Sequence, residues 1–208
     1  MKKTFILAIA TLLFGANLAH ATDKPGGLTS TAVGLPTNTY EVLLSPAYAL
    51  SPGGAYLSSE MRMQPWEDVG LGLGFGAGEL GFNVGGNGTW FVSPDLSNQP
   101  AFALKGGMYF NRVATANYFV FQVTPMTSKA FHTSWAKISP YAGLPMGPSF
   151  ALGGLATNQF TMKVSTGVEF DVKSWGGLHL WTEFGFGILH SVHEIVFGVS
   201  YPFNGLAS

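Results

Sequence analysis

The sequence contains no cysteine and very little charge. Without cysteine there is no disulfide framework, no thiolate nucleophile and no cysteine-ligated metal. Charged residues make up 10% of the 208 positions, against about 25% in an average soluble domain. Ten basic residues against eleven acidic ones leave no basic excess for binding a nucleic acid, so we expect no nucleic-acid partner. The scarcity of charge indicates that much of the surface does not face water.

Long hydrophobic runs are also missing beyond the N-terminus. Lys2 and Lys3 precede an apolar stretch over residues 4–18, and Ala19-His20-Ala21 fits the small-x-small rule for cleavage. The sequence therefore predicts a signal peptide over residues 1–21. No later window holds 18 consecutive apolar residues, so we expect no transmembrane helix in the mature chain.

Residues 22–38 have the composition of a flexible N-terminal segment, with two prolines, three glycines and scattered Ser and Thr. After it, the dominant hydrophobic period is two. Apolar and polar or small residues alternate along 160–172, 69–78 and 194–203, which is typical of β-strands. Turn signals between the alternating runs predict ten strands, at about 39–49, 54–64, 68–77, 81–92, 101–111, 117–124, 133–144, 158–172, 177–189 and 193–203.

Ten such strands predict an all-β fold. Most are close to the roughly 9 to 11 residues that a tilted strand needs to cross a bilayer. In hydrocarbon every backbone polar group must be paired, so the sheet has to close. We therefore expect a closed antiparallel up-and-down transmembrane β-barrel over residues 39–203, with a short tail at 204–208. The alternatives are a soluble lipocalin-like barrel, or eight strands, since Pro46, Pro125 and Pro140 fall in or beside predicted strands.

Four of the five tryptophans lie in or beside predicted turns. Trp66, Trp90, Trp135 and Trp175 all belong to turns at the same end of the predicted barrel. An indole ring combines an apolar body with a polar N–H, so tryptophan concentrates at the lipid headgroup level. These four residues predict one aromatic girdle.

The C-terminal strand carries a short motif. Gly198-x-x-Tyr201-x-Phe203 resembles the assembly signal of bacterial outer-membrane β-barrel proteins. The resemblance implies a location in the Gram-negative outer membrane, with outer-membrane lipids as surroundings and the barrel-assembly machinery as a partner during biogenesis. It also implies that both termini face the periplasm and that the longest connection, 145–157, faces outward.

The inward faces of the predicted strands carry most of the charge. They predict a charged plug at the periplasmic end, below a cavity lined by small residues such as Gly74, Gly85 and Gly185; alternatively the glycines only relieve crowding. The predicted inward charges are Glu41, Glu60, Arg62, Lys105, Lys137, Lys163, Glu169, Asp171, Glu183 and Glu194.

Ten strands leave at most a narrow lumen, because porins with aqueous channels use about 16 to 18. We therefore expect a structural or scaffold protein of the cell envelope, or a narrow, porin-like and gated channel with mild cation preference, whose ligand or ion the sequence does not identify. The alternative is an enzyme acting on lipid or peptide at the outward rim through His190, Ser191 and Glu194. We expect no cofactor and no metal, and His132 and His179 stand isolated as structural residues.

Overall fold

A computed structural model of the chain describes residues 27–28, 30–36, 39–51, 54–63, 68–77, 80–153 and 156–204. The predicted signal peptide, Trp66 and residues 205–208 lie outside these described residues. Within the described part of the chain, no helix is both long enough and apolar enough to cross a membrane.

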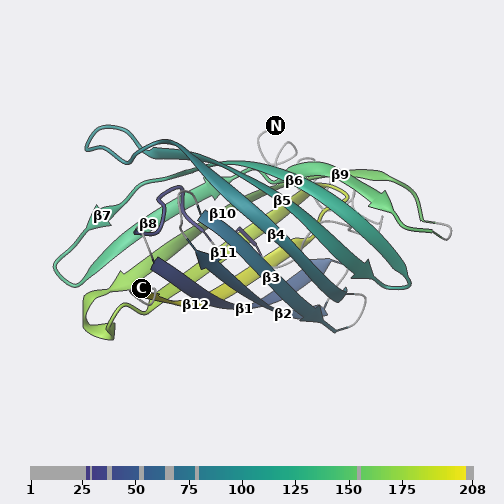
Figure 1. The fold of residues 1–208 in the computed structure, drawn as a ribbon, viewed down its shortest axis with the longest axis horizontal. Coiled ribbons are helices and arrows are strands. Elements are labelled where there is room, and N and C mark those ends of the chain that lie inside the picture. Colours follow the sequence, from purple (N-terminus) through teal and green to yellow (C-terminus); the bar gives the residue numbers. More distant parts are fainter. Residues whose placement is uncertain are drawn as a thin grey trace, which may run out of the picture.

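The described strands form one antiparallel sheet that closes on itself (Figure 1). Neighbours in sequence pair around the ring, β12 pairs with β1, and β10 pairs with β11. The elements are β1 (Thr39–Ser51), β2 (Gly54–Met63), β3 (Asp68–Gly76), β4 (Leu80–Ser93), β5 (Ala101–Val113), β6 (Ala116–Ser128), β7 (Phe131–His132), β8 (Ala136–Gly143), β9 (Met146–Ala151), β10 (Gln159–Val172), the 3-10 turn η1 (Lys173–Trp175), β11 (His179–Leu189) and β12 (His193–Asn204).

Two of these elements share one place in the wall. Both β8 and β9 pair with β6 on one side and with β10 on the other, so together they act as a single strand. The short β7 pairs with β8 alone. The barrel therefore has ten strand positions among the described residues, and the prediction of a closed antiparallel barrel of about ten strands is confirmed.

The predicted outward connection 145–157 is wrong over its first half. Residues 146–151 form β9 and continue the wall. The ladder is interrupted for only two residues, where the Leu144 amide bonds to the Pro125 carbonyl (3.0 Å) and the Lys163 amide bonds to the Pro145 carbonyl (3.0 Å). Pro145 has no N–H to donate, so the ladder is broken locally, and β9 continues the line of β8 beyond it.

Pro46, Pro125 and Pro140 each lie where the ladder with one neighbouring strand is interrupted or has ended, and each keeps its register with the strand on the other side. The β1–β12 register runs from Leu44 to Ala47 without pairing Ser45 or Pro46. Pro125 faces the junction of β8 and β9. Pro140, in β8, lies just beyond the end of β6, and its carbonyl accepts the Lys129 amide (3.1 Å). A closed barrel has no edge strand on which a proline could leave its missing N–H unpaired. The local interruptions of the ladder provide such places instead.

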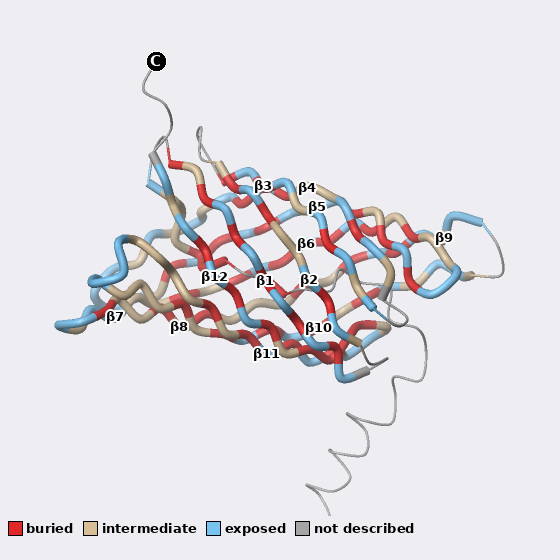
Figure 2. The backbone as a smooth tube through the Cα atoms, turned by 90° about the horizontal axis from the view of Figure 1, so that it is seen from below, coloured by how far each residue is buried: buried red, intermediate tan, exposed pale blue. Residues whose placement is uncertain are grey.

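The barrel is apolar outside and polar inside. Along β1, Glu41 is 0% exposed and Ser45 1%, whereas Leu44 is 49% and Tyr48 55% exposed. We call the end where Thr39 pairs with Asn204 the terminal mouth, and the opposite end the far mouth. Figure 2 shows the alternation of buried and exposed residues along the strands, with β7 toward the terminal mouth and β9 toward the far mouth.

The connections at the terminal mouth are tied to one another. Lys129 Nζ donates to Asp95 Oδ1 (2.7 Å), and the Ala130 amide donates to Asp95 Oδ2 (2.7 Å). These bonds join the β4–β5 turn to the segment after β6 and, with the Lys129 bond as the larger cause, hold the pKa of Asp95 below its ordinary value. Similarly, Lys173 Nζ donates to the Thr133 carbonyl (2.8 Å).

Candidate functional site in the barrel lumen

A cluster of charges fills the lumen near the terminal mouth. Arg62 donates to Glu41 and lies 4.0 Å from Asp68. The second oxygen of Glu41 accepts the Ser200 hydroxyl (2.7 Å), which in turn accepts the Trp181 indole N–H (2.9 Å). Charges removed from water are tolerated when they are paired and hydrogen-bonded in this way. Glu41 and Arg62 thus lie together, as the alternation predicts.

The histidine expected to be isolated belongs to this cluster. His179 Nδ1 lies 3.0 Å from Glu169 and 3.5 Å from Glu41, and its Nε2 lies 3.9 Å from Asp171. Asp171 is also the register partner of Lys137, and both are half-buried. The expectation of isolation is wrong because it considered spacing along the chain, whereas β10, β11 and β1 bring these residues together.

A second set of polar contacts lies across the barrel from His179. Lys105 Nζ lies 3.6 Å from Glu60 Oε1, which also accepts the Asn87 side-chain amide (3.2 Å). Lys105 further donates to the backbone carbonyl of Leu28 (3.2 Å). The barrel wall is therefore bonded to a chain segment that precedes its first strand.

The third set lies toward the far mouth. Lys163 Nζ donates to Glu194 Oε1 (2.6 Å), and their side chains are 2% and 1% exposed. Tyr141 donates its hydroxyl proton to Glu183 (2.8 Å), whose carboxylate is fully buried. The sequence predicts Glu194 both as a lumen charge and as part of an enzyme site at the rim. Its bond to the buried Lys163 ammonium group places it in the lumen.

The N-terminal segment, here residues 27–36 as far as described, lies inside the lumen. The amide of Leu28 donates to both oxygens of Glu183 (2.8 and 3.0 Å), and the amide of Gly27 donates to Glu194 (3.2 Å). Nearer the terminal mouth, the Ala32 amide donates to Ser128 Oγ (3.0 Å). The composition of residues 22–38 predicts flexibility and says nothing about location, so sequence reasoning missed this arrangement.

Glycine at position 27 is required by this approach. Its φ of +73° lies in the left-handed region that disfavours a side chain, and a Cβ there would lie 2.8 to 2.9 Å from the Glu183 carboxylate. Leu28 then packs with the buried side chains of Leu43, Tyr141 and Trp181 in mid-lumen.

Sequence reasoning also missed Asp68. This buried carboxylate lies 4.0 Å from Arg62 and accepts the amide of Leu35 from the N-terminal segment (3.3 Å). The alternation of the strand could have identified it. Asp68 is two residues before the inward Gly70 and next to the outward Val69, so it falls on the inward face.

The buried charges of the lumen are not balanced. Six carboxylates and three bases are buried among the described residues, a formal sum of −3 with His193 taken as neutral. Amides of the N-terminal segment donate to three of the six carboxylates, namely Asp68, Glu183 and Glu194. The acids are Glu41, Glu60, Asp68, Glu169, Glu183 and Glu194, and the bases are Arg62, Lys105 and Lys163.

The predicted cavity of small residues near the far mouth is occupied by aromatic rings. A Cβ on Gly74 would overlap the Tyr56 hydroxyl, and one on Gly85 or Gly107 would overlap the Tyr109 ring. The glycines therefore make room for tyrosine side chains, which agrees with the alternative that they relieve crowding. The prediction of an open cavity is wrong at these positions.

Two separate apolar clusters result at the far mouth. One is carried by β12, β1 and β2 and the other mainly by β5 and β6. These groups of strands lie on opposite walls of the ten-position ring. The first comprises Ala47, Ala49, Tyr56, Val192 and Val196, and the second Tyr109, Val113, Tyr118 and Val120.

The residues proposed for catalysis have separate partners. Ser191 donates to the Leu189 carbonyl (2.9 Å), His190 Nδ1 lies 3.2 Å from the Phe160 carbonyl, and Glu194 accepts from Lys163. None of these contacts joins the hydroxyl to a histidine base. In the described part of the chain, no group of three or more His, Cys, Asp or Glu residues is placed to hold a metal ion.

Of the remaining described residues that the sequence singles out, the tryptophans, Tyr201 and Phe203 lie on the outer wall or at its rim, whereas Gly198 is buried on the inward face. Trp90, Trp135 and Trp175 are exposed and belong to the terminal mouth. Tyr201 and Phe203 of the C-terminal motif point outward, and Phe203 stacks on Tyr40 with ring centroids 5.7 Å apart. Their roles in a girdle and in assembly stay predictions.

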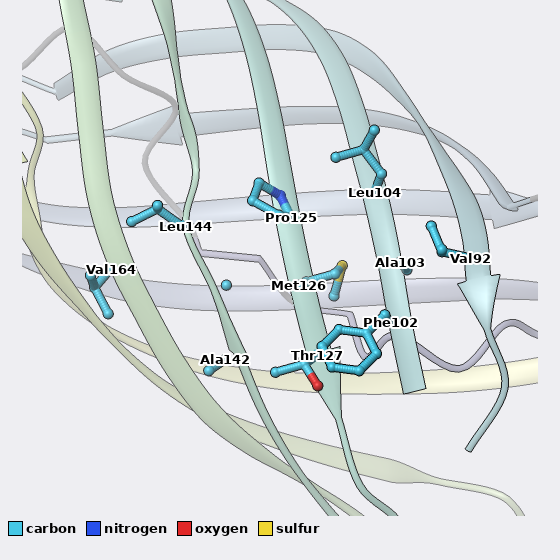
Figure 3. A pocket seen from close by; sticks show the side chains of 11 residues that line it. Val92, Phe102, Ala103, Leu104, Pro125, Met126, Thr127, Ala142, Leu144 and Val164 are labelled. Atoms are coloured by element: carbon cyan, nitrogen blue, oxygen red, sulfur yellow. The ribbon is translucent and has the colours of Figure 1, made fainter. Parts of the chain in front are cut away.

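A shallow apolar hollow of about 540 Å³ lies on the outer wall (Figure 3). Outward side chains of Val92, Phe102, Leu104 and Pro125 line it, together with Leu144 at the junction of β8 and β9. The buried residues Ala103 and Met126 line it as well.

No family model matches the chain, and no curated protein sequence matches it. Among solved structures, it is similar to a de novo designed transmembrane β-barrel at 12% identity and a TM-score of 0.41, covering 82% of this chain and 100% of that one. It is also similar to Ail, the attachment invasion locus protein of Yersinia pestis, solved with the heparin analogue sucrose octasulfate. That similarity has 11% identity and a TM-score of 0.30, and covers 79% of this chain and 96% of that one.

Proposed function

We propose that the protein is an integral outer-membrane barrel whose lumen is a narrow cation-preferring channel, held closed by its own N-terminal segment. The observation that carries this proposal is the bonding of segment amides to Asp68, Glu183 and Glu194, three carboxylates of a lumen with a buried charge of −3.

The location in a membrane is supported by the outer wall. Large apolar side chains such as Leu71 (64% exposed) and Phe75 (65%) cover it, while charges lie inside. Soluble monomers rarely expose contiguous apolar patches above a few hundred Å². An outward apolar band with a polar interior is the arrangement of membrane barrels. The predicted signal peptide over residues 1–21 and the resemblance of the C-terminal motif to an assembly signal support the bacterial outer membrane as this membrane.

The closed state is supported by the way the acids are satisfied. A carboxylate removed from water is costly unless it is paired and hydrogen-bonded, and Glu183 receives two of its bonds from the Leu28 amide. Because these donors belong to a segment that lies in the lumen and is not part of the barrel wall, they can leave without breaking a strand ladder. Their departure exposes negative charge to the lumen, which raises the local concentration of cations.

Planar-bilayer recordings test this proposal. The full chain should be silent, and a variant lacking residues 22–36 should show small discrete openings that prefer K⁺ to Cl⁻. Glu183→Gln in that background should reduce the preference. Because a deletion can prevent folding, a second variant, Ala32→Pro, removes the amide donated to Ser128 and fixes φ at that position without shortening the chain. It should give brief openings. A fold check by the heat-dependent gel shift accompanies each recording.

The structural-barrel reading makes the opposite prediction. The two apolar clusters of the far mouth and the Leu28 cluster place packed apolar side chains inside the barrel, which suits a scaffold protein. Folded deletion and Ala32→Pro proteins that stay silent at all voltages would overturn the channel and leave the scaffold role.

A further inference from the structure

The hollow on the outer wall follows a row of paired residues that crosses the strands. Ala103 pairs with Met126, and Met126 pairs with Gly143. Figure 3 shows the lining side chains spread along this row, from Val92 on β4 to Val164 on β10. The hollow therefore crosses four interstrand spacings, or about 19 Å at a spacing of about 4.8 Å.

The row rises obliquely from the terminal mouth toward the middle of the wall. Val92 is next to the last residue of β4, at the terminal mouth, whereas Leu144 lies at the junction of β8 and β9. Strands of membrane barrels tilt by about 35–45°, so a row of about 19 Å perpendicular to them rises by roughly 11–13 Å. One leaflet contributes about 15 Å to a hydrocarbon core about 30 Å thick. The hollow thus matches the acyl region of the leaflet that borders the terminal mouth.

The lining is suited to hydrocarbon. None of the described residues that line the hollow is charged. Thr127 has the only polar side chain among them, and its hydroxyl donates to the Ala101 carbonyl (2.9 Å). A polar ligand would lose its hydrogen bonds to water here without replacing them. The volume of about 540 Å³ lies in the range of small-ligand sites, about 300–1,000 Å³.

The hollow is recessed into the wall. Ala103 and Met126 are 4% and 3% exposed, yet both line it. The small residues Ala142 and Gly143 leave space above this floor, and the β6 ladder is interrupted beside it, where β6 passes from β8 to β9. On the lumen side, Ala32 of the N-terminal segment packs with Ala103 and Met126. The floor is therefore supported from behind.

We propose that this hollow is a binding site for one acyl chain of a phospholipid in the leaflet that borders the terminal mouth. The site is continuous with the apolar wall, and the exposed Trp90 and Trp135 of the predicted girdle lie at the mouth where it begins. A chain seated there contacts both the outward side chains and the recessed floor, so it buries more apolar surface than a chain on the convex wall. This inference rests on the membrane location proposed above and is independent of the channel.

Photocrosslinking with a chain-labelled lipid tests the site. The full chain is refolded into phosphatidylcholine vesicles that contain a small fraction of phosphatidylcholine with a diazirine on one acyl chain, and mass spectrometry locates the crosslinked residues. We expect crosslinks at 102–104, 125–127 and 142–144 to exceed those at other outward residues several-fold, and to saturate as the labelled fraction rises.

Two variants separate the hollow from the rest of the wall. Ala142→Phe fills the hollow from outside and should remove the excess of crosslinks, and Ala142→Leu should reduce it if the larger ring prevents folding. Thr182→Phe is the matched control, because Thr182 lies between the buried Trp181 and Glu183 and outside the hollow. It should leave the excess unchanged. The heat-dependent gel shift checks the fold of each variant.

Three outcomes would overturn the site. Crosslinks spread evenly over the outward residues, or an excess that survives both Ala142 variants in folded protein, would remove it and keep the membrane location. A lack of crosslinks over the whole outer wall would remove the membrane location as well. A dimer in the same vesicles that Ala142→Phe dissociates would assign the hollow to a second copy of the chain. Silence in the bilayer recordings would remove the channel and leave the lipid site standing.

Discussion

The pairing of Lys163 with Glu194 allows the lumen electrostatics to be measured. Their side chains are 2% and 1% exposed, with Nζ and Oε1 2.6 Å apart. Lys163→Met keeps an unbranched side chain of similar length and removes the charge. Breaking a buried pair from one side costs about 3–5 kcal/mol. Because Glu194 keeps the Gly27 amide as a donor, we expect the lower end, about 3 kcal/mol, or roughly a 100-fold fall in the folding constant.

Urea unfolding of protein refolded into lipid vesicles measures this cost, followed by tryptophan fluorescence. The double variant Lys163→Met/Glu194→Leu removes both charges and should recover most of the loss, since an apolar pair of similar volume often replaces a buried ion pair at little cost. Lys129→Met is the matched control, because Lys129 also forms a 2.7 Å ion pair but is 26% exposed and should cost below about 1 kcal/mol. Equal losses for Lys163→Met and Lys129→Met, or a double variant as unstable as the single, would refute the reasoning.

Three further predictions concern the wall, the packing and the turns. Leu44→Arg, at mid-β1 on the outer face, should lower the free energy of unfolding in vesicles by about 2–4 kcal/mol, and Leu44→Phe should not. Gly74→Ala should destabilise by about 1–3 kcal/mol through overlap with the Tyr56 hydroxyl, and Tyr56→Phe should restore part of the loss in a double-mutant cycle. The Asp95 pKa is lowered by its Lys129 bond, so its contribution to stability is present above the ordinary carboxyl pKa and lost as pH falls through the lowered value. Unfolding curves of the wild type and Asp95→Asn should therefore differ near neutral pH and converge in acid; a difference that grows in acid would contradict the assignment.

The wall of the barrel could be predicted from sequence because alternation with a period of two encodes both the strand and the side on which each residue lies. Glu41 and Leu44 fall on the predicted faces, three residues apart on one strand. Only local disruptions were misjudged. A connection was predicted at 145–157, but the strand resumes after Pro145 because β6 and β10 still offer backbone partners on both sides.

The interior of the site could be predicted only in part. Docking of the N-terminal segment uses backbone amides of Gly27 and Leu28, and backbone donors leave no pattern in a sequence. The fit of Tyr56 over Gly74 depends on the β2–β3 register, which alternation alone does not fix. His179 meets Glu169 across the β10–β11 hairpin, and it meets Glu41 only after the β12–β1 pairing closes the ring.

Spin-label scanning along β1 tests the central claim most directly, namely that the apolar face of the wall meets acyl chains and the polar face meets the lumen. Single cysteines at successive positions from 41 to 48 are labelled after refolding into vesicles, and their accessibility to oxygen and to a water-soluble nickel chelate is measured. The account predicts high oxygen accessibility at positions 42, 44, 46 and 48 and low values at 41, 43, 45 and 47. Alternation in the opposite phase, or access of the nickel chelate to position 44, would contradict it.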